Sequence, residues 1–212
     1  MALPKSLLDG YWRFRDERHA PDKGRYQQLA SLGQSPTAMV IGCCDSRVDI
    51  SAIFDAEPGD IFIMRNVANL VPPFERDGKF HGTSAAVEYA ATVLNVPNLI
   101  VLGHSQCGGI AAYRVSDKDK DDPSFIGRWL TLLKGLDVKE SEIKAFGEET
   151  AFELAGVRQS LANLRTFDAL QEREGADLLS LHGLHFDISS GTVLALDEET
   201  DTFAPLPKDD VA

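Results

Sequence analysis

Two short segments of the chain hold all three of its cysteines and one of its five histidines. The first segment contains Cys43 and Cys44, and the second, about sixty residues later, contains His104 and Cys107. Zinc prefers thiolate and imidazole ligands, and a catalytic zinc keeps three protein ligands so that a fourth position stays open for water. One cysteine of the first segment, together with His104 and Cys107, supplies that number. The two segments therefore predict a catalytic zinc site.

Other interpretations of the cysteines fit less well. Disulfide pairing is disfavoured because the number of cysteines is odd and the N-terminal residues lack the pattern of a secretory signal, which indicates a reducing compartment. A closed structural zinc with three thiolates would need both Cys43 and Cys44 on the metal. Neighbouring side chains of an extended segment point to opposite faces, so that geometry is poor.

A cysteine phosphatase is the sharpest alternative among enzymes. Cys107 is followed by two glycines and later by Arg114, an order that resembles a reactive thiolate in a phosphate-binding loop. The spacing argues against this reading, because the arginine of such a loop would stand at the position of Tyr113. Metal content distinguishes the two interpretations.

An acid and a base, Asp45 and Arg47, follow directly after Cys43. Zinc lowers the pKa of a bound water, but two thiolates cancel the charge of the metal, so another group is needed to assist the reaction. An ionised Asp45 can accept a hydrogen bond from hydroxide at the zinc and orient it, and Arg47 can hold Asp45 in place through a bidentate contact. The alternative is a local ion pair that only caps the segment.

Three motifs resemble the signatures of the β-class carbonic anhydrases, in the same order and at similar intervals. They are Cys-x-Asp-Ser-Arg at 43–47, Arg-Asn-Val-Ala-Asn at 65–69 and His-x-x-Cys-Gly-Gly at 104–109. The resemblance is strong from about residue 34 to residue 112 and weaker towards the C-terminus. Three motifs in register are far more specific than any one of them alone.

The resemblance implies an enzyme that interconverts carbon dioxide and bicarbonate with water, using one Zn2+ per chain. It gives the metal-ligand roles to Cys43, His104 and Cys107, and it gives no such role to Cys44. Asp45 and Arg47 take the catalytic roles, as the pair that orients hydroxide at the zinc.

The plant-like branch of the family also implies a substrate pocket, partly contributed by a neighbouring subunit. Its residues match Gln34, Phe62, Val67, Tyr89 and Gly108. An amide and a glycine N–H can polarise a substrate oxygen while apolar side chains exclude water. We therefore expect a homodimer or an assembly of dimers, with residues 1–33 as a helical arm that packs on the partner.

A non-enzymatic alternative is a zinc-stabilised binding protein, such as a sensor of bicarbonate or carbon dioxide, although the presence of Asp45 and Arg47 argues against it. Some bacterial members of the family hold an inhibitory bicarbonate with a Trp, an Arg and a Tyr. These positions correspond to Val40, Arg65 and Phe186, so only the arginine is present. We therefore predict no cooperative inhibition through that site.

Composition bounds the remaining possibilities. A chain of 212 residues with 43% hydrophobic content suffices for a single domain spanning residues 1–212. Its net charge of −12 disfavours nucleic acid and anionic membranes as partners. The apolar runs are too short to span a bilayer. We expect a cytoplasmic protein. The other histidines are candidates for proton transfer but are more simply explained as surface residues: His19, His81, His182 and His185.

Short apolar runs at 37–41, 60–64 and 98–102 predict strands buried on both faces. A helical pattern at 83–94, with Thr83 or Ser84 as its N-cap, lies between the second and third runs. Alternating strands and helices predict an α/β fold with a mostly parallel central sheet flanked by helices. The motifs directly follow these strands, so the site is expected at their carboxyl ends.

The C-terminal third of the chain is expected to support this sheet. Residues 142–172 carry apolar side chains at helical spacing, which is typical of a core-facing helix. Two further runs, at 178–188 and 192–196, flank a Ser-Ser-Gly turn and predict a hairpin that extends the sheet at one edge.

Overall fold

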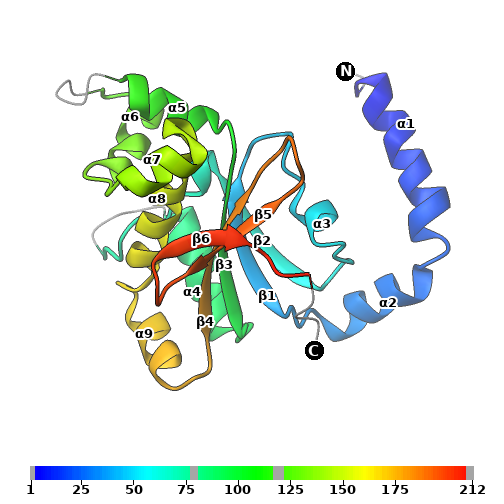
Figure 1. Ribbon diagram of the computed structural model, residues 1–212. Helices are drawn as coiled ribbons and strands as arrows, with labels where there is room; N and C mark the ends of the chain where they lie inside the picture. The colour runs from blue at the N-terminus through cyan, green and yellow to red at the C-terminus, as the bar shows by residue number, and fades with distance from the viewer. Residues whose placement is uncertain (1–2, 77–80, 117–121, 209–212) are drawn as a thin grey trace.

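The computed structural model describes residues 3–76, 81–116 and 122–208. Its centre is a six-stranded sheet with the order β2-β1-β3-β4-β5-β6 (Figure 1). The first four strands in that order are parallel, and the last two continue the sheet antiparallel. The strands are β1 Ala38–Cys43, β2 Ile61–Asn66, β3 Asn98–His104, β4 Ser180–Phe186, β5 Val193–Asp197 and β6 Thr202–Pro205. The expected α/β fold with a C-terminal hairpin is confirmed.

The strands form here because their apolar side chains are buried on both faces of the sheet. Met39 and Ile41 of β1 belong to one core, whereas Val40 between them belongs to another. The first core lies beneath the helical layer, where α8 contacts β3 and β4, and α4 contacts β2. The helices of this layer are α4 Gly82–Thr92, α8 Glu148–Leu164 and α9 Asp168–Gly175.

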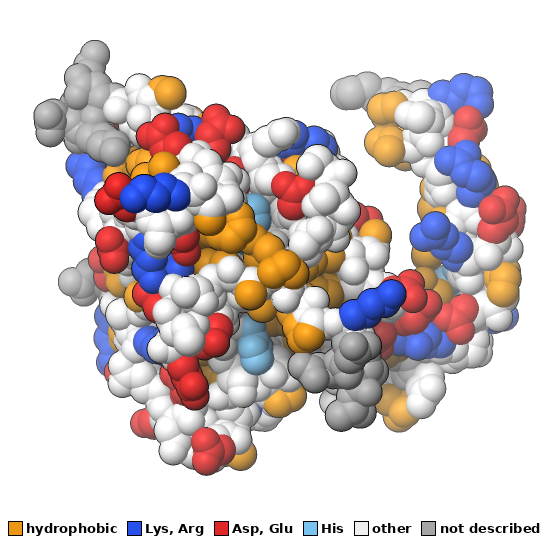
Figure 2. All heavy atoms as spheres, in the orientation of Figure 1, with side chains coloured by type: hydrophobic (Ala, Val, Ile, Leu, Met, Phe, Trp, Pro, Cys, Tyr) orange, Lys and Arg blue, Asp and Glu red, His pale blue; other side chains and the backbone are white. Residues whose placement is uncertain are grey.

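The opposite face of the sheet has a thinner cover. The short helix α3, Ile50–Ile53, packs there through Ile50, against Val40 and Leu102. Further along this face, a groove of about 330 Å³ is lined by apolar and polar side chains that include Ile100, His182 and Leu206. Figure 2 shows apolar side chains gathered at the centre of the visible face of the molecule.

Three strand ends meet at one edge of the sheet. Cys43 ends β1 and is in register with Asn66, which ends β2, and His104 ends the neighbouring β3. Helix α5, Gly108–Val115, then begins directly after Cys107. This arrangement confirms that the sequence motifs meet at the carboxyl ends of the parallel strands.

Some local expectations were wrong. Helix α4 begins at Gly82 with no side-chain cap, and the Thr83 hydroxyl instead accepts a hydrogen bond from Asn66 Nδ2, at 3.2 Å. By contrast, residues 142–172 are largely helical as expected, in three helices, and Gly147 with a φ of 87° separates α7 from α8. Strand β6 was not expected. The remaining short helices are α6 Phe125–Leu130, the 3-10 turn Thr131–Leu133 and α7 Glu140–Phe146.

The N-terminal segment stands apart from the sheet as an arm (Figures 1 and 2). It consists of α1 Lys5–Arg13, a π-helical segment Phe14–His19 and α2 Lys23–Leu32, and none of these elements contains a buried residue. Arg25 ties α2 to the body through an ion pair with Asp60, at 2.7 Å. Within the described part of the chain, no helix has both the length and the apolar character needed to cross a membrane.

Candidate metal centre

The three sequence-predicted ligands come together at the strand ends. One ligand atom from each of Cys43, His104 and Cys107 lies within 4.8 Å of the others. All three residues are buried, with His104 fully inaccessible. Two sulfurs and one ring nitrogen at this separation match the donor set that zinc prefers.

Backbone groups support the sulfur of Cys43. Ala68 donates its N–H to Cys43 Sγ at 3.4 Å, from a turn in which Ala68 has a left-handed φ of 64°. Arg65 fixes the adjoining loop by donating to the carbonyl oxygens of Cys43 and Asp45, at 2.8 and 2.7 Å, and to that of Val48. A hydrogen bond from the Cys107 thiol, more than the backbone donors, lowers the pKa of Cys43 to about 4. Cys43 is therefore prepared to bind as a thiolate.

His104 presents a free ring nitrogen to the cluster. Its Nδ1 lies 2.9 Å from the carbonyl oxygen of Ser105, so Nδ1 carries the proton and donates it to that oxygen. Nε2 is buried and has no hydrogen-bond partner among the described residues. A buried imidazole nitrogen without a partner is costly unless something binds it, and the fixed tautomer leaves its lone pair available to a metal.

Cys107 lies at the start of α5, where helix amides are free to donate. The amides of Gly109 and Ile110 favour its thiolate form, as expected at a helix N-terminus. The neighbouring Cys43 sulfur and burial outweigh them and raise the pKa of Cys107 in the metal-free protein. A metal would displace this shared proton, because metal binding requires both sulfurs to be deprotonated. The residues present thus fit a divalent metal with affinity for thiolate.

Asp45 and Arg47 form the bidentate pair that the sequence predicted. Arg47 Nε donates to Asp45 Oδ1 at 2.9 Å, and Nη2 donates to Oδ2 at 2.7 Å. Arg47 also donates to the backbone carbonyl of Gln106, at 3.0 Å, which links the first motif to the third. The side-chain and backbone hydrogen bonds from Arg47 hold the pKa of Asp45 well below its usual range. The carboxylate is therefore ionised and fixed beside the ligands.

The predicted substrate-pocket residues are only partly together within one chain. Val67 lies in the turn beside Ala68, and Gly108 follows Cys107, so both adjoin the cluster. Phe62 of β2 packs against Tyr89 of α4, with ring centroids 5.9 Å apart. Gln34 is exposed just after α2, and no described contact joins it to the cluster.

The structure also bears on two alternatives. Arg114 forms ion pairs with Glu148 and Glu149, at 2.9 and 3.1 Å, and so is not directed to Cys107 as a phosphate-loop arginine would be. At the positions of the inhibitory bicarbonate site, Val40 is fully buried and Arg65 is occupied by backbone carbonyls. The contacts of Arg114 argue against the phosphatase interpretation, and the absence of cooperative bicarbonate inhibition stays a prediction.

Two buried groups lie behind the cluster: Glu153, which sequence reasoning missed, and His185, which it assigned to the surface. Glu153 accepts the backbone N–H of Cys107 at 3.0 Å, and its other oxygen lies 2.9 Å from His185 Nε2. His185 is 1% exposed, so its assignment to the surface was wrong. A signal was available, because Glu153 lies four residues before Val157 and so falls on the core-facing stripe of α8.

With this geometry in view, the comparisons with known proteins agree. The family model described as carbonic anhydrase matches residues 38–193. Beta carbonic anhydrase 5 of Arabidopsis thaliana, a chloroplastic protein, is 38% identical over 181 residues, covering 82% of this chain and 58% of its own length. The solved structure of the β-carbonic anhydrase CcaA superposes with a TM-score of 0.82 at 30% identity, covering 95% of this chain and 98% of that one. The chain therefore belongs to the β-class carbonic anhydrases.

The relatives also differ from this chain in length and include a tetramer. This chain spans little more than half the length of the Arabidopsis relative, whose name places it in the chloroplast, so the cytoplasmic location stays a prediction. A tetrameric β-carbonic anhydrase from Sordaria macrospora has a TM-score of 0.68 at 28% identity, covering 91% of this chain and 92% of that one.

Proposed function

We propose that the protein catalyses the reversible hydration of carbon dioxide to bicarbonate and a proton, with one zinc ion held by Cys43, His104 and Cys107. The observation that carries this proposal is the ligand cluster itself: two buried sulfurs, one of which receives a backbone N–H group, and one buried imidazole nitrogen without a partner among the described residues. Zinc bound there supplies a water of lowered pKa, and thus a hydroxide nucleophile near neutral pH.

The chain's own residues then orient the reaction. Asp45, held ionised by Arg47, accepts a hydrogen bond from the nucleophile. This contact orients the nucleophile so that a lone pair on its oxygen points at the substrate carbon. The link from Arg47 to Gln106 fixes this acceptor relative to Cys107, which limits the motion that would misalign it. The Asp45–Arg47 pair therefore acts as a positioning device rather than as a cap.

Recognition of a small linear substrate needs a dry wall and one or two donors. We propose that Val67, Phe62 and Tyr89 supply the wall, and that the Gly108 amide and the Gln34 side chain polarise a substrate oxygen. Gln34 and Tyr89 are exposed in the single chain, which fits a pocket completed by a second subunit.

The deciding experiment measures zinc per chain and carbon dioxide hydration on the same preparation. One zinc per chain, with activity that disappears on chelation and returns on zinc addition, is the expected result. Stoichiometric zinc without hydration would favour the sensor alternative. Phosphatase activity in metal-free protein would instead favour the cysteine phosphatase.

We also propose that the N-terminal arm packs on a second copy of the chain. Leu7 and Trp12 of α1 are 62% and 48% exposed, an unusual density of apolar surface for a helix without a partner. The tetrameric Sordaria macrospora relative supports assembly. Deletion of residues 1–15 should reduce the sedimentation coefficient and the activity together, whereas a fully active monomer would contradict the proposal.

A further inference from the structure

The buried carboxylate of Glu153 joins three elements behind the metal centre. It extends from α8, accepts the Cys107 backbone N–H at 3.0 Å with Oε1, and meets His185 Nε2 of β4 at 2.9 Å with Oε2. The side chains of Glu153 and His185 are 3% and 2% exposed. No arginine or lysine among the described residues contacts this carboxylate.

Burying this carboxylate and imidazole costs free energy of folding, which indicates a role other than stability. A carboxylate removed from water loses several kcal/mol of solvation, and only good hydrogen bonds repay part of that loss. His185 adds to the cost, because its Nδ1 is buried without a partner among the described residues. An apolar pair of similar volume would pack in this core more favourably.

The metal ligands differ in how their backbones are held. Cys43 and His104 end strands, so the sheet register fixes them. Cys107 lies outside the sheet, after Gln106, whose backbone has a left-handed φ of 58°. Its N–H is not part of a strand or a helix ladder, and Glu153 is the group that binds it.

We propose that Glu153 is a positioning residue that directs Cys107 Sγ towards the metal, and that His185 acts through Glu153 by holding its second oxygen. Anchoring the N–H fixes the peptide plane before Cys107, and α5 begins at the next residue, so together they restrict the direction of its Cα–Cβ bond. This inference rests on the proposed metal centre and assigns a role to two residues outside it.

The test compares Glu153→Met with Glu142→Met in the zinc-loaded protein. Met keeps the length of Glu without its acceptor oxygens, and Glu142 is a matched control because it is 5% exposed, close to the 4% of Glu153, but pairs with Arg158. Both changes should lower the melting temperature. Only Glu153→Met should speed zinc loss to a chelator, by about 10-fold to 100-fold, the range typical of groups that orient a metal ligand.

A spectroscopic readout separates positioning from general destabilisation. In cobalt-substituted protein, the thiolate-to-cobalt charge-transfer band should shift or weaken in Glu153→Met and stay unchanged in Glu142→Met. Glu153→Gln should restore most of the wild-type behaviour, because its oxygen can accept from Cys107 and its amide can donate to His185. If the Met variant does not fold, the Gln variant still tests whether an acceptor oxygen at this position is needed.

His185 is tested by a double-mutant cycle. His185→Leu should speed zinc loss less than Glu153→Met does, and adding it to Glu153→Met should cause no further acceleration. Additive effects would overturn the proposed route through Glu153. Equal zinc loss and equal spectra in Glu153→Met and Glu142→Met would overturn the positioning role, while wild-type protein that binds no zinc would instead refute the proposed function.

Discussion

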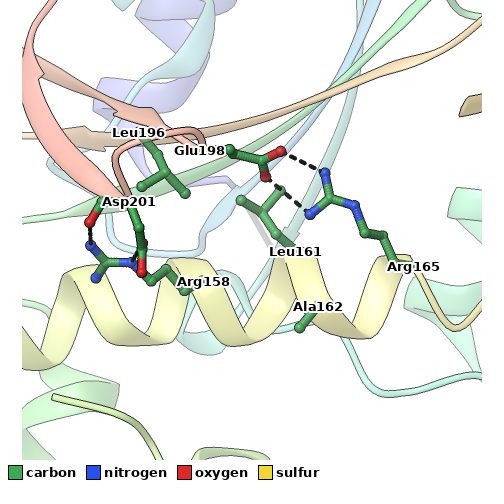
Figure 3. Close-up of a pocket in the computed structure, with 7 residues that line it drawn as sticks. All are labelled: Arg158, Leu161, Ala162, Arg165, Leu196, Glu198 and Asp201. Atoms are coloured by element: carbon green, nitrogen blue, oxygen red, sulfur yellow. Dashed lines mark hydrogen bonds and ion pairs between the residues drawn. The ribbon is translucent and has the colours of Figure 1, made fainter. Parts of the chain in front are cut away.

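Two arginine–carboxylate clusters in this molecule use the same chemistry in different ways. One is the site pair, Asp45 and Arg47, beside the metal ligands. The other, here named the clasp, joins Arg158 of α8 and Arg165, which follows α8, to carboxylates of the β5–β6 turn (Figure 3) and of neighbouring helices. The clasp consists of Arg158, Arg165, Glu142, Glu174, Glu198 and Asp201.

Four residues of the clasp line a hollow of about 310 Å³, namely Arg158, Arg165, Glu198 and Asp201, but both arginines are already paired with acids. Arg158 binds Glu142 and Asp201, and Arg165 binds Glu174 and Glu198 at 2.9 and 2.8 Å. Figure 3 shows both arginines directed to acids of the turn rather than into open space. Each guanidinium is shared by two carboxylates, so neither arginine is free to attract an anionic ligand.

The site pair differs in what lies beside it. Arg47 binds one carboxylate and uses its remaining donors on Gln106, so Asp45 is fixed without a second acid nearby. Its neighbours are the proposed metal ligands. In the proposed function, the site pair serves the reaction because it orients an acceptor beside them, whereas the clasp, whose arginines pair with several acids, serves stability.

The largest expected effect is at the ligands. Cys43→Ser should abolish zinc binding and activity, because a serine hydroxyl is a poor zinc ligand and the site would keep only two of its three. Metal analysis and a hydration assay check this. Cys44→Ser is the matched control, since Cys44 is exposed and adjacent, and it should keep both properties. The reverse result would reassign the ligand.

The next prediction applies one change to both clusters. Asp45→Asn should keep zinc but lower kcat by about 100-fold, because the amide presents a donor where an acceptor is needed. Asp201→Asn, in the clasp, should leave kcat unchanged. Stopped-flow hydration with zinc analysis on each variant measures both. Unchanged turnover in Asp45→Asn would make the site pair structural and remove the contrast between the clusters.

The third prediction is that a change in the clasp lowers stability but not activity. Arg158→Met should destabilise the protein by about 2 kcal/mol, because it leaves the buried Glu142 without its partner. Activity per folded molecule should stay at the wild-type value. Arg165→Met, whose side chain is 36% exposed, should cost less. Urea unfolding and active-site titration test the pair of variants, and loss of kcat in either one would give the clasp a catalytic role.

The sequence was sufficient for the parts of the site that are local or lie at strand ends. Cys43, Asp45 and Arg47 lie within one short motif, and buried strands have a clear pattern, so their convergence with His104 followed from parallel topology. The spacing of Asp45 and Arg47 even indicated a bidentate contact, which the side chains make.

Contacts between distant elements could not be predicted in the same way. The helical spacing of α8 indicates that Glu153 faces the core, but only the packing of α8 against the sheet makes Cys107 its partner. Strand β6 was hidden by the charged turn before it, where Asp197 accepts from the amides of Glu199 and Thr200. In the sequence such a turn resembles a solvated loop, and only the pairing of β5 with β6 shows that it belongs to a hairpin.

The smallest expected effect concerns Asp187, a carboxylate held without any arginine. Hydrogen bonds from the Ser189 hydroxyl and the Ser190 amide lower its pKa from 3.8 to about 2. A depressed pKa contributes stability that is fully present above pH 4 and is lost as the pH falls towards 2. Ser189→Ala should therefore be slightly less stable than wild type at pH 6, and the difference should shrink as the pH is lowered through 4 and 3. Urea unfolding of the two proteins at each pH measures this difference. A gap that stays constant with pH would show that the serine stabilises the turn without acting on the charge of Asp187.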